Sequence, residues 1–144
     1  MDAQFKYYEG SMEDFIAQAG NKGDNHLIKI RLAPSALQDF PGYWHVLDNF
    51  AVRLIMHRHS GRRERLRGQE PITLTDFFQI LQIVLHPDSV KTTICKNGNQ
   101  GMIYTTDISD ETYILIEEVR TGHSELAVST LYKRKKKLTD AKSP

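Results

Sequence analysis

The amino-acid sequence predicts an α+β fold in which N-terminal helices pack on a C-terminal four-stranded antiparallel sheet. Two observations favour this arrangement. Long segments before Val90 carry apolar side chains with a helical period of about 3.6 residues, whereas the chain after Val90 alternates with a period of two. The connections between the alternating segments are only a few residues long, which is typical of antiparallel neighbours.

Three helices are predicted, over residues 11–20, 43–59 and 73–86. The first begins at a capping serine and ends at a glycine. The second is the longest and carries apolar side chains at the i, i+3, i+4, i+7 and i+8 positions of an amphipathic helix. The third opens with a capping box, in which an aspartate follows a threonine by three residues, and it stops before a proline.

A first strand is predicted over residues 26–32, where apolar and polar side chains alternate. The four C-terminal strands cover residues 90–96, 101–107, 111–120 and 125–135. Strict alternation in the last strand places the hydroxyls of Thr130 and Tyr132 on the same face as the apolar Leu126 and Val128. That face would leave the core and enter a cleft. The alternative is that both hydroxyl residues lie exposed at a sheet edge.

The chain has 144 residues and a hydrophobic share of 40%, which fits one domain with a real core. No apolar run is long enough to cross a membrane, and no signal-peptide pattern opens the chain. The single cysteine, Cys95, excludes an intrachain disulfide and a cysteine-based metal site.

The net charge is only +1, but the positive side chains are concentrated in two clusters. Six of the 19 Lys and Arg residues lie between Arg53 and Arg67, and five consecutive basic residues run from Lys133 to Lys137. Two solvated faces would explain these clusters without a function. Alternatively, they create a local positive field that favours a phosphate-bearing ligand.

His57 and His59 lie at the predicted end of the longest helix, beside a loop with four arginines. Residues two apart on a helix point about 200° apart, so this pair does not have the spacing to chelate one metal, and no metal site is predicted. Either imidazole is a candidate general acid or base, because imidazole titrates near neutral pH. The alternative is that both histidines border the apolar stripe of an amphipathic helix.

Other catalytic patterns are absent. The sequence contains no nucleophile elbow, P-loop or dinucleotide-binding glycine pattern. The neighbouring carboxylates Glu117 and Glu118 would point to opposite faces of a strand, which disfavours a glycosidase-type pair.

The order of these features resembles the barnase–EndoU–colicin–RelE group of ribonucleases, in the compact form used by phage-encoded and contact-dependent bacterial toxins. The resemblance covers residues 45–136 and rests on the helix ending in IMHRH, the basic loop, the segment PITLTDFFQILQIVLHPDSV and the closing strand LAVSTLYKRKKK. We accordingly expect an N-terminal segment of open role at residues 1–40, a ribonuclease-like catalytic domain at 41–137 and a tail at 138–144.

The resemblance implies helices on a four-stranded antiparallel sheet, and RNA cleavage with no metal and no other cofactor. A base activates the ribose 2′-hydroxyl, which attacks the adjacent phosphate, while cations stabilise the developing negative charge. The catalytic residues implied are His57 or His59, Thr130, Tyr132 and Arg58. The implied substrate-binding residues are Arg62, Arg63, His123, Lys133 and Arg134, with His123 also a candidate for the second histidine of the group.

The leading hypothesis is therefore a metal-independent endoribonuclease toxin. Its expected partners are RNA, with tRNA as a candidate substrate, and a cognate immunity protein that covers the basic cleft. Such a toxin would act in the cytoplasm of a target bacterial cell, delivered within a larger secreted or phage protein. A non-enzymatic RNA-binding or adaptor domain is the alternative. A metal-dependent DNase is disfavoured, because clusters of carboxylates and histidines are lacking.

Overall fold

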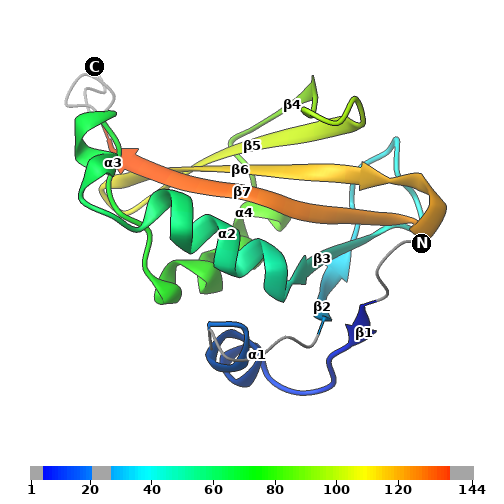
Figure 1. Ribbon diagram of the computed structural model, residues 1–144. Coiled ribbons are helices and arrows are strands. Elements are labelled where there is room, and N and C mark those ends of the chain that lie inside the picture. Colours follow the sequence, from blue (N-terminus) through cyan, green and yellow to red (C-terminus); the bar gives the residue numbers. More distant parts are fainter. Residues whose placement is uncertain (1–4, 21–26, 137–144) are drawn as a thin grey trace.

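The computed structural model describes residues 5–20 and 27–136 (Figure 1). Its strands are β1 (Lys6–Tyr7), β2 (Ile28–Pro34), β3 (Trp44–Asp48), β4 (Ser89–Ile94), β5 (Gln100–Ile108), β6 (Glu111–Arg120) and β7 (Glu125–Lys135). Its helices are α1 (Met12–Ala19), α2 (Asn49–His59), α3 (Arg63–Leu66) and α4 (Ile80–Leu85), with 3₁₀ turns η1 (Leu74–Gln79) and η2 (Thr121–His123). The predicted tail, residues 138–144, lies outside the described residues.

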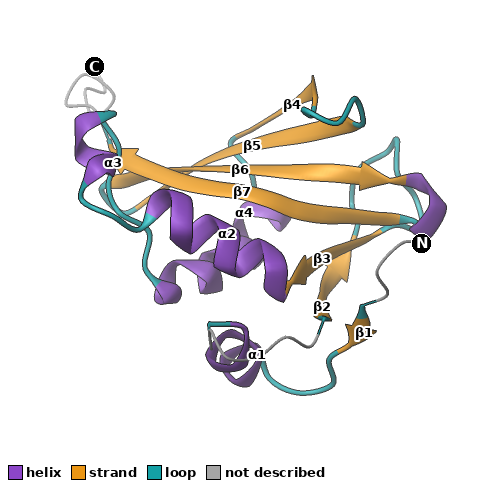
Figure 2. Cartoon of the chain, viewed as in Figure 1, coloured by secondary structure: helices purple, strands orange, loops and turns teal. Residues whose placement is uncertain are grey.

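The strands form one mixed sheet in the order β1-β2-β3-β7-β6-β5-β4 (Figure 2). The C-terminal strands β4 to β7 make the predicted antiparallel meander. However, β3 pairs with β7 in parallel, and β2 and β1 extend the sheet beyond β3. The predicted fold, N-terminal helices on a four-stranded antiparallel sheet, is therefore wrong: the N-terminal part supplies three of the seven strands.

Besides the two-residue β1, the prediction lacks β3, which lies at the start of the predicted helix 43–59. Four of its five residues are buried. They form one short continuous buried run, without the alternation of buried and exposed side chains that marks a strand with one face in solvent. A short buried run cannot be assigned to strand or helix by periodicity alone. In the structure the strand ends and the helix begins at Asp48. Its Oδ1 accepts a hydrogen bond of 2.7 Å from the Ala51 N–H and so caps α2.

The other predicted helix ends are confirmed. Ser11 accepts a hydrogen bond of 3.0 Å from the Asp14 N–H and caps α1. The capping box of Thr73 and Asp76 is present, although it opens the 3₁₀ turn η1, which then continues into α4.

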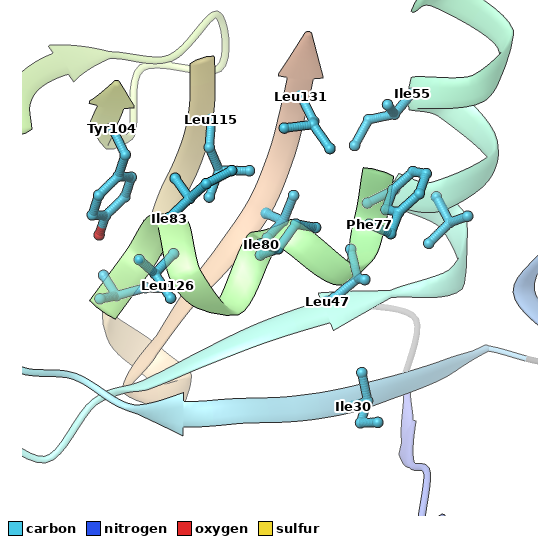
Figure 3. Packing of buried hydrophobic residues seen from close by; sticks show 14 of the residues in the cluster. Ile30, Leu47, Ile55, Phe77, Ile80, Ile83, Tyr104, Leu115, Leu126 and Leu131 are labelled. Carbon is cyan, nitrogen blue, oxygen red and sulfur yellow. The ribbon is translucent and has the colours of Figure 1, made fainter. Parts of the chain in front are cut away.

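The hydrophobic core lies between the sheet and the helices α1, α2 and α4. Figure 3 shows Ile80 and Ile83 of α4 packed against Leu115 of β6 and Leu131 of β7. Ile55 of α2 approaches the same cluster. The opposite face of the sheet is left open around β5, β6 and the second half of β7.

A β-bulge in β7 decides which side chains reach that open face. The register pairs Thr130 with Ile116 but Val128 with Glu117, so Ser129 is an extra residue in β7. After the bulge, Leu131 faces the core, whereas Thr130 and Tyr132 turn to the open face. The predicted alternation, which put both hydroxyls on the face of the apolar residues before the bulge, is therefore wrong.

No helix among residues 5–20 and 27–136 is long and apolar enough to span a membrane.

Candidate active site

A basic cleft of about 750 Å³ opens beside the C-terminal end of α2. Its walls come from the end of α2, the loop that contains α3, and the turn between β4 and β5. Five cationic side chains, two histidines and one carboxylate line it, together with a glycine: Arg58, Arg62, Arg63, Arg67, Lys96, His57, His59, Glu64 and Gly61.

His59 is held by a buried carboxylate. Its Nδ1 lies 3.0 Å from Oε2 of Glu64, whose side chain is only 1% exposed. The carboxylate also accepts a bond of 3.1 Å from Arg67. An Nδ1–H that donates to Glu64 fixes the ring in the tautomer whose Nε2 carries a lone pair. This arrangement suits a base that takes a proton from a ligand in the cleft.

The ring of His59 also stacks on Tyr132 of β7. The two ring centroids are 5.6 Å apart and the planes are inclined by 29°. Tyr132 reaches this position because the bulge turned it to the open face. The structure thus brings together the helix-end histidine and one of the two predicted hydroxyl residues.

The loop that carries Glu64 is tied to both neighbouring elements. The Ile72 N–H donates to the His59 carbonyl at 2.7 Å, which satisfies a carbonyl at the end of α2. The Glu70 N–H donates to the Lys133 carbonyl of β7 at 2.8 Å. Because backbone bonds anchor the loop on both sides, Glu64 is fixed relative to His59.

Arg58, Arg62 and Arg63 supply positive charge without a partner among the described residues. No acidic side chain in residues 5–20 and 27–136 forms a salt bridge with any of these three guanidinium groups. Guanidinium groups donate in a planar fork that matches phosphate oxygens. The cleft therefore has the electrostatic character of an anion site.

His57 is exposed and lines the same cleft, but no hydrogen bond holds its ring among the described residues. It also borders a separate depression around Met56 and Leu74, on the other side of α2. Thr130 lies on the open face of β7, next to the basic cleft in a second pocket that it shares with Arg58.

The structure does not bring the remaining predicted residues into the cleft as expected. Lys133 follows Tyr132 directly and so points to the opposite face, where its Nζ binds Asp76 at 3.1 Å and Glu111 at 3.0 Å. His123 lies in η2 before β7 begins, roughly 20 Å along the strand from Tyr132. Arg134 shares the face of Tyr132 by alternation and is half-buried.

Four cleft residues were given no role from the sequence: Gly61, Glu64, Arg67 and Lys96. Glu64 follows His59 by five residues across a helix end, a spacing with no fixed geometry. Lys96 lies in the β4–β5 turn, far from α2 in sequence, and its place in the cleft depends on the path of that hairpin. Among residues 5–20 and 27–136, no group of three His, Cys, Asp or Glu side chains is arranged to hold a metal ion.

Comparison with curated proteins and with solved structures gives no significant match. A family model does match: residues 27–141 fit the family described as phage-Barnase-EndoU-ColicinE5/D-RelE like nuclease3. This span is well over half of the chain and contains every residue of the basic cleft. The predicted relationship to the barnase–EndoU–colicin–RelE group is confirmed, and the chain belongs to this phage nuclease family.

Proposed function

We propose that this chain is a metal-independent endoribonuclease. The observation that carries the proposal is the Glu64–His59 pair at the edge of a cleft lined by five cations. A nuclease of this composition can act on RNA without a metal, because RNA carries its own nucleophile in the 2′-hydroxyl.

The chemistry assigns one role to each group. Nε2 of His59 takes the proton from the 2′-hydroxyl, and the oxygen attacks the adjacent phosphorus. The bond from phosphorus to the 5′ oxygen breaks, and that oxygen takes a proton as it leaves, which gives a 2′,3′-cyclic phosphate and a 5′-hydroxyl. Arg58, with Arg62 and Arg63, stabilises the negative charge that builds up on the phosphate oxygens.

Tyr132 orients the imidazole through the stacked contact, and the Thr130 hydroxyl contacts the bound nucleotide. His57 is the second imidazole of the cleft and is the candidate donor of the proton to the leaving oxygen. We assign the base to His59 rather than His57, because only His59 has a carboxylate that fixes its ring.

The experiment compares cleavage of total RNA and purified tRNA by the wild-type chain, His59→Ala and His57→Ala, in excess EDTA. We expect cyclic-phosphate ends from the wild type and a loss of about 100-fold or more for His59→Ala, since a general base contributes about 10² to 10⁴. Added imidazole should restore part of the His59→Ala activity. The His57→Ala variant should lose less than His59→Ala.

Three outcomes would reject the proposal. Cleavage that requires added Mg²⁺ would contradict the metal-independent mechanism. RNA that is retarded on a gel but never cut would instead support a non-enzymatic RNA-binding domain. Equal activity of wild type and His59→Ala would show that His59 is not the general base.

We further propose that the nuclease acts as a toxin in the cytoplasm of a target bacterium, and that an immunity protein protects the producing cell. The basic cleft favours an acidic partner. Expression of the wild-type chain should arrest bacterial growth, and His59→Ala should not. Arrest by both variants would contradict a toxicity based on RNA cleavage.

A further inference from the structure

An apolar stripe runs along the outer side of η1 and α4. Its members are large side chains that are each between 37% and 43% exposed: Leu74, Phe78, Leu81 and Leu85. The inner side of the same segment is buried, and Figure 3 shows Ile80 and Ile83 packed toward the sheet. The inner side already anchors the segment to the core, so the fold does not require large apolar side chains on the outer side. A continuous apolar surface of this kind marks an interaction site.

The segment that carries the stripe has no exposed formal charge. Asp76 is the only Asp, Glu, Lys or Arg between Thr73 and His86, in a chain of which 26% is charged. Its carboxylate is buried and binds Tyr113 and Lys133. The lack of Lys and Arg disfavours a nucleic acid or a membrane surface as the ligand. An apolar centre without charge is instead the composition of a protein–protein interface.

The spacing of the stripe points to a second copy of the same chain as the partner. Its members follow one another at intervals of four, three and four residues, so the spacing is the same in both directions. When two copies meet around a two-fold axis perpendicular to the helix, their helices run antiparallel and the same patch serves both. An axis between Phe78 and Leu81 would place Phe78 on Leu81 of the second copy. Leu74 would meet Leu85, so every member of the stripe would have an apolar partner.

Opposite charges lie at the two ends of the stripe. At one end, Arg53 lines the same depression as Leu74. At the other end, the exposed Asp88 follows Leu85 by three residues. In an antiparallel pair, the cationic end of each copy approaches the acidic end of the other. Charge complementarity therefore favours the antiparallel pair over a parallel one, in which like charges would meet.

We propose that the chain forms a two-fold symmetric dimer through this stripe, with α4 of one copy antiparallel to α4 of the other. The apolar centre is small beside the roughly 800 Å² per partner of a standard interface, so the association is weak and depends on concentration. None of the four stripe residues lines the basic cleft, and the dimer is therefore expected to leave the clefts of both copies open.

The first test measures the mass of the full chain by sedimentation equilibrium. Between about 10 µM and 1 mM, the average mass should rise from one chain toward two. Leu81→Glu places a carboxylate against Phe78 of the second copy and should raise the dissociation constant of the dimer at least about tenfold. Leu81 is partly exposed in the single chain, so thermal unfolding of this variant should stay close to that of wild type.

Gln82→Glu is the matched control. It adds the same charge at the next position of α4, where the side chain is exposed and lies outside the stripe. The dissociation constant should therefore change by less than about threefold. Equal weakening by both variants would overturn the proposal, because the effect would then come from net charge rather than from the stripe.

The second test measures the orientation of the two copies by disulfide formation. Leu74→Cys and Leu85→Cys chains, both with Cys95→Ser to remove the only natural thiol, are mixed in equal amounts with one of them labelled with ¹⁵N. The antiparallel pair brings these two positions together, so disulfides between unlike chains should exceed the share expected from random pairing. Mass spectrometry of the oxidised mixture separates the products.

Three outcomes would overturn the dimer: a single-chain mass at every concentration, an association that Leu81→Glu leaves unchanged, or disulfides mainly between like chains. Neither test uses RNA or depends on cleavage. Failure of the dimer would therefore leave the proposed ribonuclease function in place, and failure of that function would leave the dimer in place.

Discussion

Oε2 of Glu64 lies 3.0 Å from Nδ1 of His59, and the carboxylate is almost completely buried. This pair predicts that Glu64→Gln lowers kcat, because an amide can donate to Nδ1 and allow the wrong tautomer. A misoriented catalytic group costs on the order of 100-fold. The side-chain volume is kept, so KM should change little. The change is measured in steady-state cleavage of a defined RNA.

The matched control is Glu70→Gln, in the same loop. Glu70 binds the exposed Arg65 at 3.4 Å and does not touch His59, so its substitution should leave kcat within a few-fold of wild type. An equal loss of kcat in both variants would show that loop structure, rather than the orientation of His59, is responsible.

Tyr132 offers a separate test of the stacked contact with His59. Tyr132→Phe keeps the ring and should retain most of the activity. Tyr132→Ala removes the ring and should lower kcat about 2- to 10-fold, because aromatic pairs contribute about 0.5 to 1.5 kcal/mol. A severe loss in Tyr132→Phe would instead assign a direct role to the hydroxyl. Cleavage rates and thermal unfolding of both variants separate activity from stability.

Asp76 predicts a pH dependence of stability. Burial raises the pKa of Asp76, but hydrogen bonds from the Tyr113 hydroxyl, the Thr73 N–H and Lys133 outweigh it and hold the pKa below the ordinary value for an aspartate. A depressed carboxyl pKa stabilises the fold above the unfolded-state pKa, and this contribution is lost as the pH falls through the folded-state pKa. The free energy of unfolding should therefore decrease below about pH 4.

Asp76→Asn should remove this behaviour. At about pH 7 the variant should be less stable by roughly 1.5 to 3 kcal/mol, since hydrogen bonds from charged groups are lost. The difference from wild type should shrink as the pH falls through the folded-state pKa of Asp76, because the wild-type carboxyl then also becomes protonated. Asp39→Asn, on the exposed surface, is the control and should follow the wild-type curve. Denaturant unfolding at neutral pH and over a series of acidic pH values provides the measurement.

Gly101 predicts a steric limit beneath the β4–β5 turn. A methyl group there would approach the Cys95 Sγ to 2.7 Å and the Glu117 carbonyl oxygen to 3.1 Å. Overpacking of this kind costs about 1 to 3 kcal/mol, so Gly101→Ala should lower the free energy of unfolding by that amount.

Removal of the thiol should relieve part of the cost. The Gly101→Ala substitution should lower the free energy of unfolding less in a Cys95→Ala background than in the wild-type protein. A double-variant cycle of thermal unfolding measures the coupling. Strictly additive effects would show that Cys95 does not limit the space at Gly101.

The sequence correctly predicted those elements whose pattern lies within a few neighbouring residues. The caps at Ser11 and Thr73 depend on side chains three residues apart, and the meander from β4 to β7 shows both alternation and short turns. The strand Trp44–Asp48 could not be separated from the helix that follows it, because a short buried run satisfies both patterns. Its parallel pairing with β7 joins segments about eighty residues apart, and no local signal encodes such a contact.

The types of side chain in the candidate site were predictable from the sequence, but their positions relative to one another were not. His59 and the arginine loop were found because imidazole and guanidinium side chains gather near one helix end. Glu64 and Lys96 were missed, since their relation to His59 depends on the paths of a loop and of a hairpin. Lys133 was assigned to the substrate, although the bulge at Ser129 turns it inward to Asp76.

The bulge at Ser129 makes the length of β7 as important as its composition. Deletion of one residue there would restore strict alternation and exchange the two faces of the strand beyond it. Lys133 would then point into the cleft and Tyr132 toward the helices. The stacking of Tyr132 on His59 and the ion pair of Lys133 with Asp76 would therefore be lost together. Variation in this nuclease should therefore tolerate substitutions along β7 far better than insertions or deletions of a single codon.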